Sequence, residues 1–299
     1  MRANAADPIR LLVGFSPGGT VDLIARAISE GLRKEGYTCV VENKVGASGR
    51  LAFDALLASP NDGQTLMLAP STQVTLLPYT SKSHARLAKT TVAVGSVAQC
   101  YFGLAVNAET GPATLQEYLA SATREPSKAF YATPGAGTIQ DFIGQLLARK
   151  ANVPLAAIPY RGGAAALNDL IGGVVPAVIS ATPNLLQMHR AGRIRLLGVS
   201  ADMPLPLLSE IPTFALLGYP ELTTSEHICI FAPRGLASEK IAAYSTVLKK
   251  VVAQRATQEI LERQDYVPRF LDHIEANQRI ERDAIRWEEA VKSTGFAPT

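Results

Sequence analysis

The sequence predicts an α/β fold of two lobes, each built around its own β-sheet. Apolar runs rich in β-branched residues alternate with stretches whose apolar residues recur at helical spacing. This alternation occurs twice along the 299 residues, and 47% of the residues are apolar, which is enough for two packed cores. Strands that alternate with helices form parallel sheets through right-handed crossovers, so each series of elements predicts a separate sheet.

The first series of elements occupies the first 70 residues. Strands are predicted at 8–15, 38–43 and 64–70, with helices at 22–36 and 46–59. Apolar side chains form one stripe along the first of these helices, and Gly36 fits its C-terminal cap. We therefore expect three parallel strands in this part of the first lobe.

The second series of elements repeats this scheme, and a helical tail follows it. Strands are predicted at 129–134, 156–160, 175–181 and 194–200, and helices at 115–126, 138–151, 165–173, 184–192, 239–254, 256–264 and 274–295. Long apolar runs at 96–106 and 225–233 are candidate strands that cross between the lobes. The predicted lobes are therefore residues 1–101 plus 221–299, and residues 102–220.

Charge and cysteine usage argue against several classes of protein. The net charge is only +3 and no cluster of Lys and Arg is present, which disfavours a nucleic-acid partner. No apolar run approaches the roughly 20 residues of a membrane-spanning helix. Cys39, Cys100 and Cys229 lie far apart, so they indicate neither a disulfide framework nor a metal site. We expect them to be small apolar residues of strands, and we expect no cofactor or metal.

The first residues, "MRANAADPIR", leave two interpretations open. "ANA" before Ala6 resembles a small-residue signal-peptidase site, which would indicate an exported protein written without its leader. An ordinary N-terminus of a cytosolic protein would have the same composition.

The segment "GFSPGGTVD" (14–22) follows the first predicted strand and fits the G-x-S-x-G pattern of a hydrolase nucleophile. In such enzymes the N–H after the serine donates to the oxyanion, but Pro17 follows Ser16 and has no N–H. Loss of one such donor slows catalysis roughly 100- to 1,000-fold. A Walker phosphate loop needs a lysine where Thr20 stands, and the dinucleotide pattern G-x-G-x-x-G is absent here.

What remains is an anion site made by the backbone. Gly18 and Gly19 allow a sharp turn and close approach, with Thr20 as the expected N-cap of the following helix. Free N–H groups and the helix dipole favour an anion there. The segment 131–142 repeats the arrangement, and "PYRGGAAAL" (159–167) is a third glycine turn that opens a helix. Two such turns on separate lobes suit an acid with two polar ends, although glycine turns also simply join strands to helices.

The chain resembles the substrate-binding proteins of tripartite tricarboxylate transporters, the Bug family. The resemblance covers nearly the whole chain and rests on blocks in a fixed order, among them "PIRLLVGFSPGGTVDLIAR", "VVENKVGASGRLAFDAL", "PNDGQTLMLAPST", "YATPGAGTIQDFIGQLL", "IPYRGGAAALNDLIGG" and "IFAPRGLASEKI". It implies a bilobal periplasmic binding-protein-like fold, type II-like, with two crossover strands. It also implies a periplasmic receptor, not an enzyme, that captures a small carboxylate between its lobes and delivers it to a membrane permease. The ligand would be an amino acid, a di- or tricarboxylate or an aromatic acid.

The resemblance also implies which residues contact the ligand. Backbone amides of the two turns hold a carboxylate in such proteins, and the segment after the third strand lines the cleft. These positions are Phe15, Ser16, Pro17, Gly18, Gly19, Thr20, Ser71, Thr72, Thr133, Pro134, Gly135, Ala136, Gly137 and Thr138. The chain departs from the family at Asp141, where a histidine is common, around Ala181, and near His227, where a tryptophan is common.

Several side chains have two interpretations each. Arg161 is either a partner for a distal carboxylate or a solvated cation, and Asp141 either meets a ligand ammonium or is a helix-surface charge. His227 either lines the cleft or is packed. We expect Asp22 to belong to the helix start and Trp287 to the core.

Two other functions stay open at this point, an esterase that uses Ser16 and a binding protein that serves a sensor kinase. We expect the protein to be a monomer.

Overall fold

The computed structural model describes residues 8–205 and 208–297. The candidate signal-peptidase site at residues 3–6 therefore lies outside the described residues. The chain forms two compact units, of which the first contains the described part of Met1–Gln99 together with Glu226–Glu289. The second contains Cys100–Ser225 and Ala290–Phe296. The segment 290–296, which the sequence analysis assigned to the first lobe, thus groups with the second unit.

A six-stranded sheet forms the centre of the first unit, with the strand order β11-β4-β10-β3-β1-β2. Its strands are β1 (Ile9–Val13), β2 (Cys39–Asn43), β3 (Thr65–Pro70), β4 (Thr91–Cys100), β10 (Glu226–Pro233) and β11 (Val267–Leu271). β1 pairs in parallel with β2 and β3, as the sequence predicts, while β10 runs antiparallel to β3. β11 pairs antiparallel with β4 and was not predicted, because "VPRFL" is short and carries a proline and an arginine.

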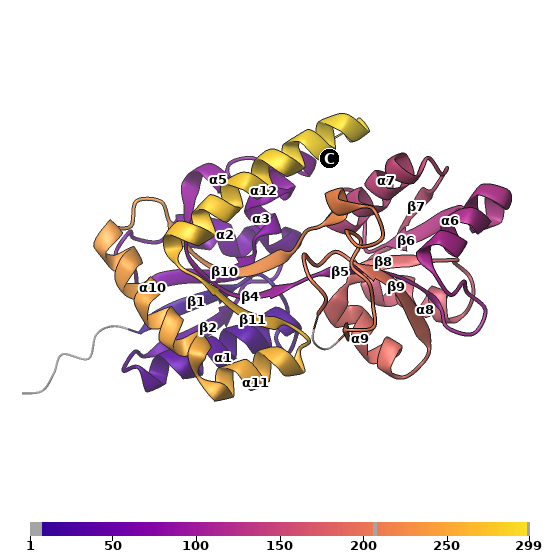
Figure 1. Cartoon of the computed structure of the whole chain (residues 1–299). Helices are drawn as coiled ribbons and strands as arrows, with labels where there is room; N and C mark the ends of the chain where they lie inside the picture. The colour runs from indigo at the N-terminus through magenta and orange to yellow at the C-terminus, as the bar shows by residue number, and fades with distance from the viewer. Residues whose placement is uncertain (1–7, 206–207, 298–299) are drawn as a thin grey trace, which may run out of the picture. The chain divides into compact units, whose positions relative to one another are not determined.

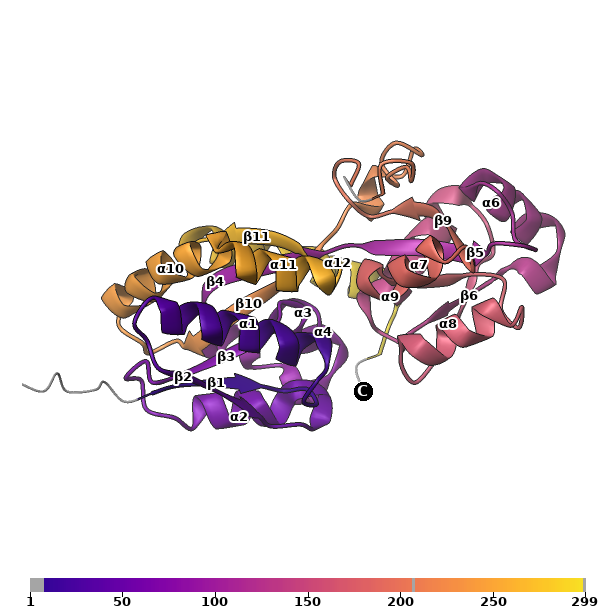
Figure 2. The same cartoon turned by 90° about the horizontal axis from the view of Figure 1, so that it is seen from below.

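Helices cover both faces of this sheet (Figure 1). One face carries α1 (Thr20–Lys34), α10 (Ser238–Ala253) and α11 (Arg255–Arg263), which lie together in the view of Figure 2. The other face carries α2 (Arg50–Leu57), α3 (Thr72–Thr75), α5 (Leu87–Thr90) and the first part of α12 (His273–Thr294). The short helices in the segment 72–90, which include α4 (Leu77–Thr80), were not assigned from the sequence.

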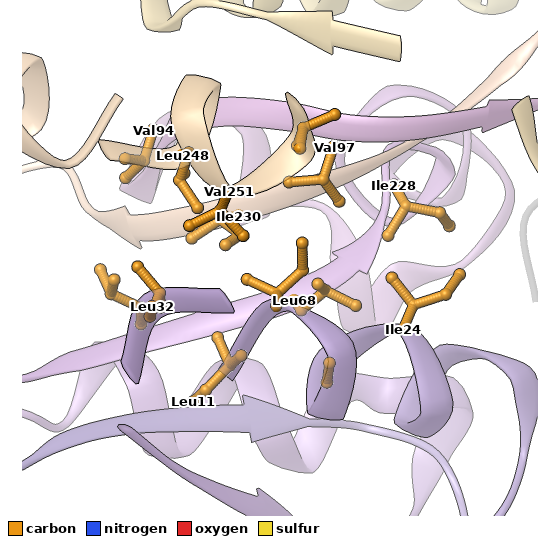
Figure 3. Packing of buried hydrophobic residues seen from close by; sticks show 14 of the residues in the cluster. Leu11, Ile24, Leu32, Leu68, Val94, Val97, Ile228, Ile230, Leu248 and Val251 are labelled. Carbon is orange, nitrogen blue, oxygen red and sulfur yellow. The ribbon is translucent and has the colours of Figure 1, made fainter. Parts of the chain in front are cut away.

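Alternating side chains of β1 anchor the strand in two cores. Leu11 and Val13 pack in the cluster beneath α1 and α10, part of which Figure 3 shows, whereas Leu12 packs in the cluster beneath α2. All three are completely buried, and burial of one such side chain stabilises the fold by about 1.5–3 kcal/mol. The end of β1, where the glycine turn begins, is therefore held on both sides.

The second unit contains a five-stranded sheet with the order β7-β6-β8-β5-β9. Its strands are β5 (Phe102–Asn107), β6 (Phe130–Thr133), β7 (Ala156–Pro159), β8 (Val178–Ala181) and β9 (Ile194–Val199). β6 pairs in parallel with β7 and β8, and β5 is antiparallel to β8 and β9. In Figure 1, α6 (Leu115–Arg124) and α7 (Ile139–Ala151) lie over one face, and α8 (Gly163–Ile171) and α9 (Thr182–Arg190) over the other.

The apolar run at 96–106 is two strands rather than one. β4 ends at Cys100 in the first sheet and β5 starts at Phe102 in the second, so the chain passes from the first unit to the second within the predicted crossover run, with a break at Tyr101. The chain returns to the first unit just before β10, which corresponds to the predicted strand at 225–233.

Other predictions about single residues can be compared directly with the structure. Cys39, Cys100 and Cys229 all lie in strands and are not joined by disulfides, and Cys39 is only half-buried. Trp287 is buried, as expected, and Gly36 follows α1 at a φ of 88°. None of the helices in the described part of the chain has the length and apolar character needed to cross a membrane.

Candidate functional site

The polar turns of the first unit gather at one edge of its sheet. β1 and β3 run in parallel with Val13 beside Leu68, so the first turn (residues 16–20) and Ser71–Thr72 leave the sheet at the same edge. β10 runs antiparallel to β3 with Ile228 beside Pro70, so its first residue, Glu226, also lies at this edge. Open α/β sheets bind ligands at the carboxyl ends of their parallel strands.

The first turn is fixed by a carboxylate of the helix that follows it. Gly18 has a φ of 78°, and its N–H donates to Asp22 Oδ2 at 2.9 Å. The N–H of Gly19 donates to the carbonyl of Ser16 at 3.2 Å. Gly19 is the N-cap of α1, so the prediction of Thr20 as N-cap was wrong. The side chain of Asp22 binds the turn from inside the helix, and Thr20 is already helical.

Asp22 belongs to the turn rather than to a ligand, as the sequence analysis expected. Its carboxylate is buried and accepts hydrogen bonds from Arg26 Nε at 2.8 Å and from Asn43 Nδ2 at 2.9 Å. Burial opposes ionisation, but the hydrogen bonds from Arg26, Gly18 and Asn43 outweigh it and lower the pKa of Asp22. Asn43 also donates to the carbonyl of Phe15 at 3.0 Å, so the end of β2 supports the first turn.

The second turn (residues 133–138) has the same construction in the second unit. Gly137 has a φ of 69°, and its N–H donates to Asp141 Oδ2 at 2.8 Å. Gln145 Nε2 donates to the other oxygen of Asp141 at 2.9 Å. Thr138 is the N-cap of α7 and accepts from the N–H of Asp141. Asp141 is 4% exposed, so it is not a helix-surface charge, and each of its oxygens accepts a hydrogen bond from its own turn or helix.

A third turn, at residues 160–163, lies beside the second. The N–H of Tyr160 donates to the carbonyl of Thr133 at 2.9 Å, and that of Gly162 to the carbonyl of Pro134 at 3.0 Å. Arg161 lies between them with an exposed side chain. Because β6 is parallel to β7 and β8, these turns and Ala181, the last residue of β8, share one edge of the five-stranded sheet.

Each turn presents main-chain amides at the start of a helix. Among the described hydrogen bonds, the N–H groups of Thr20 and Val21 in α1 and of Ile139 and Gln140 in α7 have no acceptor. The helices contain 15 and 13 residues, and the dipole of each places partial positive charge at these amides. Residues 16–19 and Ala136 are exposed. The arrangement suits a carboxylate without any cationic side chain.

The segment after β3, whose Ser71 and Thr72 are predicted ligand contacts, is joined to the start of β10 by hydrogen bonds. The N–H of Ser71 donates to the carbonyl of His227 at 2.7 Å, and Ser71 Oγ accepts from the N–H of His227 at 3.3 Å. Ser71 is buried and extends the pairing of β3 with β10. Thr72 Oγ1 donates to Glu226 Oε1 at 2.5 Å, and the N–H of Thr72 also donates to this carboxylate.

Sequence analysis did not identify Glu226 as a site residue, because its partner lies 154 positions away. Burial raises the pKa of Glu226, against the two hydrogen bonds from Thr72 that lower it. Thr72, a predicted ligand contact, therefore already holds a carboxylate of its own chain.

His227 is packed rather than cleft-lining. It is 4% exposed and its Nδ1 lies 3.2 Å from Ser96 Oγ. Burial, with the charges of Arg279 and Arg269, lowers its pKa to about 4. In the described part of the chain no histidine hydrogen-bonds to the hydroxyl of Ser16, and no group of His, Cys, Asp and Glu has the arrangement of a metal site.

A strained turn after β2 was also missed. Ala47 and Ser48 have φ angles of 45° and 53°, which only glycine adopts readily. A Cβ on Gly14 would lie 2.6 Å from the Cα of Gly49, so the two backbones touch where β1 ends. The strain is concentrated at the edge of the sheet that carries the first turn.

Comparison with known proteins agrees with this architecture. The family model of the tripartite tricarboxylate transporter family receptor matches residues 24–296. Protein BugT of Bordetella pertussis is 28% identical over 296 residues, covering 97% of this chain and 90% of BugT.

Two solved structures share the fold over nearly the whole chain. R. palustris Rpa4515 with adipate has a TM-score of 0.83 and 26% identity, covering 98% of both chains. MatC (Rpa3494) of Rhodopseudomonas palustris with bound malate has a TM-score of 0.77 and 23% identity, covering 95% of this chain and 98% of MatC. The chain therefore belongs to the tripartite tricarboxylate transporter receptor family, the Bug-type solute-binding proteins that its sequence motifs resemble.

Proposed function

We propose that this protein is a periplasmic receptor that binds a small carboxylate and delivers it to a membrane permease of the tripartite tricarboxylate type. The observation that carries the proposal is the repeated turn. In each unit a glycine at positive φ is braced by an aspartate four residues later, which leaves first-turn amides of a long helix open. These amides, at the first turn in one unit and at the second turn in the other, are the proposed carboxylate donors.

Relatives support the chemical class of the ligand. Rpa4515 was solved with adipate and MatC with malate, both of them dicarboxylates. The match to the family model over residues 24–296 includes the second turn and the start of α7, and it begins within α1, after the first turn. Family membership also supports the permease as partner and the periplasm as location.

The proposed receptor does not transform its ligand. Ser16 is exposed in the first turn, but Pro17 cannot supply the oxyanion donor of a nucleophile elbow. The hydroxyl of Ser16 has no histidine partner among the described hydrogen bonds. A nucleophilic serine needs such a base within reach.

Calorimetric titration with a panel of mono-, di- and tricarboxylates tests the proposal. We expect saturable binding of at least one acid, and weaker binding when Ile139 is replaced by proline, which removes one open amide at a position where helices tolerate proline. Ser16→Ala should bind as tightly as the wild type. Absence of heat and of any thermal shift with every acid would contradict the proposal, as would hydrolysis of an activated ester that is lost in Ser16→Ala.

A further inference from the structure

We propose that Glu226 selects the ligand, favouring a carboxylate whose far end carries a hydrogen-bond donor or a cation over one that carries a second carboxylate. The inference rests on the proposed function, since it assumes that the first turn binds the acid group. It adds a determinant of specificity within the first unit.

Strand order places Glu226 near the first turn. β3 lies between β1 and β10, so the first turn and Glu226 are two strand spacings apart at the same edge of the sheet. Neighbouring strands are about 4.8 Å apart, which gives roughly 10 Å between the ends of β1 and β10. A short aliphatic acid together with the side chain of Glu226 covers such a distance.

The carboxylate of Glu226 is held in place but has no counter-charge. Thr72 binds it through its hydroxyl and its N–H. No lysine, arginine or histidine nitrogen in the described part of the chain forms an ion pair with it. Asp22, at the same edge, differs because Arg26 pairs with it at 2.8 Å. A carboxylate has about four acceptor positions, of which Thr72 fills two, so Glu226 can still accept from a ligand.

Charge then decides between ligand classes. An ammonium or hydroxyl at the far end of the ligand fills the open acceptor positions of Glu226 and, if cationic, compensates its charge. Burial without a counter-charge raises the pKa of Glu226, and an ammonium beside it favours its ionised form and pairs with it, whereas a second carboxylate in the same place raises that pKa further and forms no ion pair. Specificity would arise from an ion pair or hydrogen bond with Glu226 that one class of ligand forms and the other does not.

Matched pairs of ligands test this directly. Each pair has one acid group in common and differs only at the far end, as in 4-aminobutyrate against glutarate and 5-aminopentanoate against adipate. We expect the wild type to bind the amino member of a pair about tenfold more tightly, which is what one hydrogen bond to a charged group contributes. Glu226→Gln keeps an acceptor for Thr72 and should remove this preference. Glu262→Gln, which removes an exposed charge from α11, should keep it.

The outcomes separate this inference from the proposed function. Tighter binding of the dicarboxylates by the wild type, or the same preference in Glu226→Gln as in the wild type, would overturn the role of Glu226 alone. Absence of binding by every carboxylate would overturn the proposed function and this inference with it. A preference of the wild type for the dicarboxylates is decisive by itself, so this outcome does not depend on the stability of the variant.

Discussion

Replacement of Asp141 by alanine should destabilise the second unit strongly, because this carboxylate holds the second turn. Its loss leaves the N–H of Gly137 buried without an acceptor and removes the hydrogen bond from Gln145. A hydrogen bond to a charged group contributes about 1.5–3 kcal/mol, and a buried donor without a partner costs about 1–3 kcal/mol. We expect Asp141→Ala to lower the free energy of unfolding by about 3 kcal/mol. Asp141→Asn, which keeps one acceptor oxygen, should lower it by about 1 kcal/mol.

Urea unfolding followed by circular dichroism measures these differences. Asp202→Ala is the matched control, because Asp202 is an exposed aspartate of the same unit, and its replacement should change the free energy of unfolding by less than about 0.5 kcal/mol. If Asp141→Ala were as stable as this control, the aspartate would not brace the turn, and the account of the second turn would be refuted.

Three further predictions concern the first unit. The folded-state pKa of His227, about 4, lies below its value of 6.5 in the unfolded chain, so the unfolded state takes up a proton first and stability is lost as pH falls from 6.5 towards 4. In His227→Gln the fall in unfolding free energy between pH 7 and pH 5 should be smaller than in the wild type by about 2 kcal/mol. Denaturant titrations at the two pH values measure this fall, and an equal fall in the variant and the wild type would contradict the prediction. Gly14→Ala should lower the free energy of unfolding by about 2 kcal/mol, because the new Cβ meets the backbone of Gly49. Gly36→Ala, whose Cβ would have nothing within 4 Å, should lower it only by the roughly 1 kcal/mol that its positive φ costs. Equal melting temperatures of these two variants would contradict the close contact of Gly14 with Gly49. Ser16→Ala should leave both the melting temperature and carboxylate affinity unchanged, and a tenfold loss of affinity would show that the hydroxyl is a ligand contact.

Local patterns predicted most of the elements because their causes are local. The apolar run at 9–13 and the helical stripe that follows depend on residues near one another in sequence, and both cores formed on those faces. The two glycine turns were also visible as a repeated pattern. The role of the two aspartates could also have been predicted, because Asp22 and Asp141 each stand four residues after the turn glycine whose N–H they accept.

Features that depend on distant partners could not be predicted. The carboxylate of Glu226 meets Thr72 across 154 positions, and nothing in the local sequence indicates this contact. The change of sheet at Tyr101 occurs inside an unbroken apolar run, because buried strands of both sheets need the same residue types. His227 is buried by packing against Ser96, 131 positions away, so its interpretation stayed open until the tertiary structure was available.

Amide chemical shifts in a two-dimensional NMR titration with a bound carboxylate test the central claim most directly. If main-chain nitrogens at the first turn and at the second turn bind carboxylate groups, the largest changes will occur at the N–H groups of Thr20, Val21, Ile139 and Gln140, which have no acceptor among the described hydrogen bonds. The amides of Gly18 and Gly137, already bound to aspartates, will shift less. Changes confined to other parts of either unit, with these four resonances unmoved at saturation, would contradict the account.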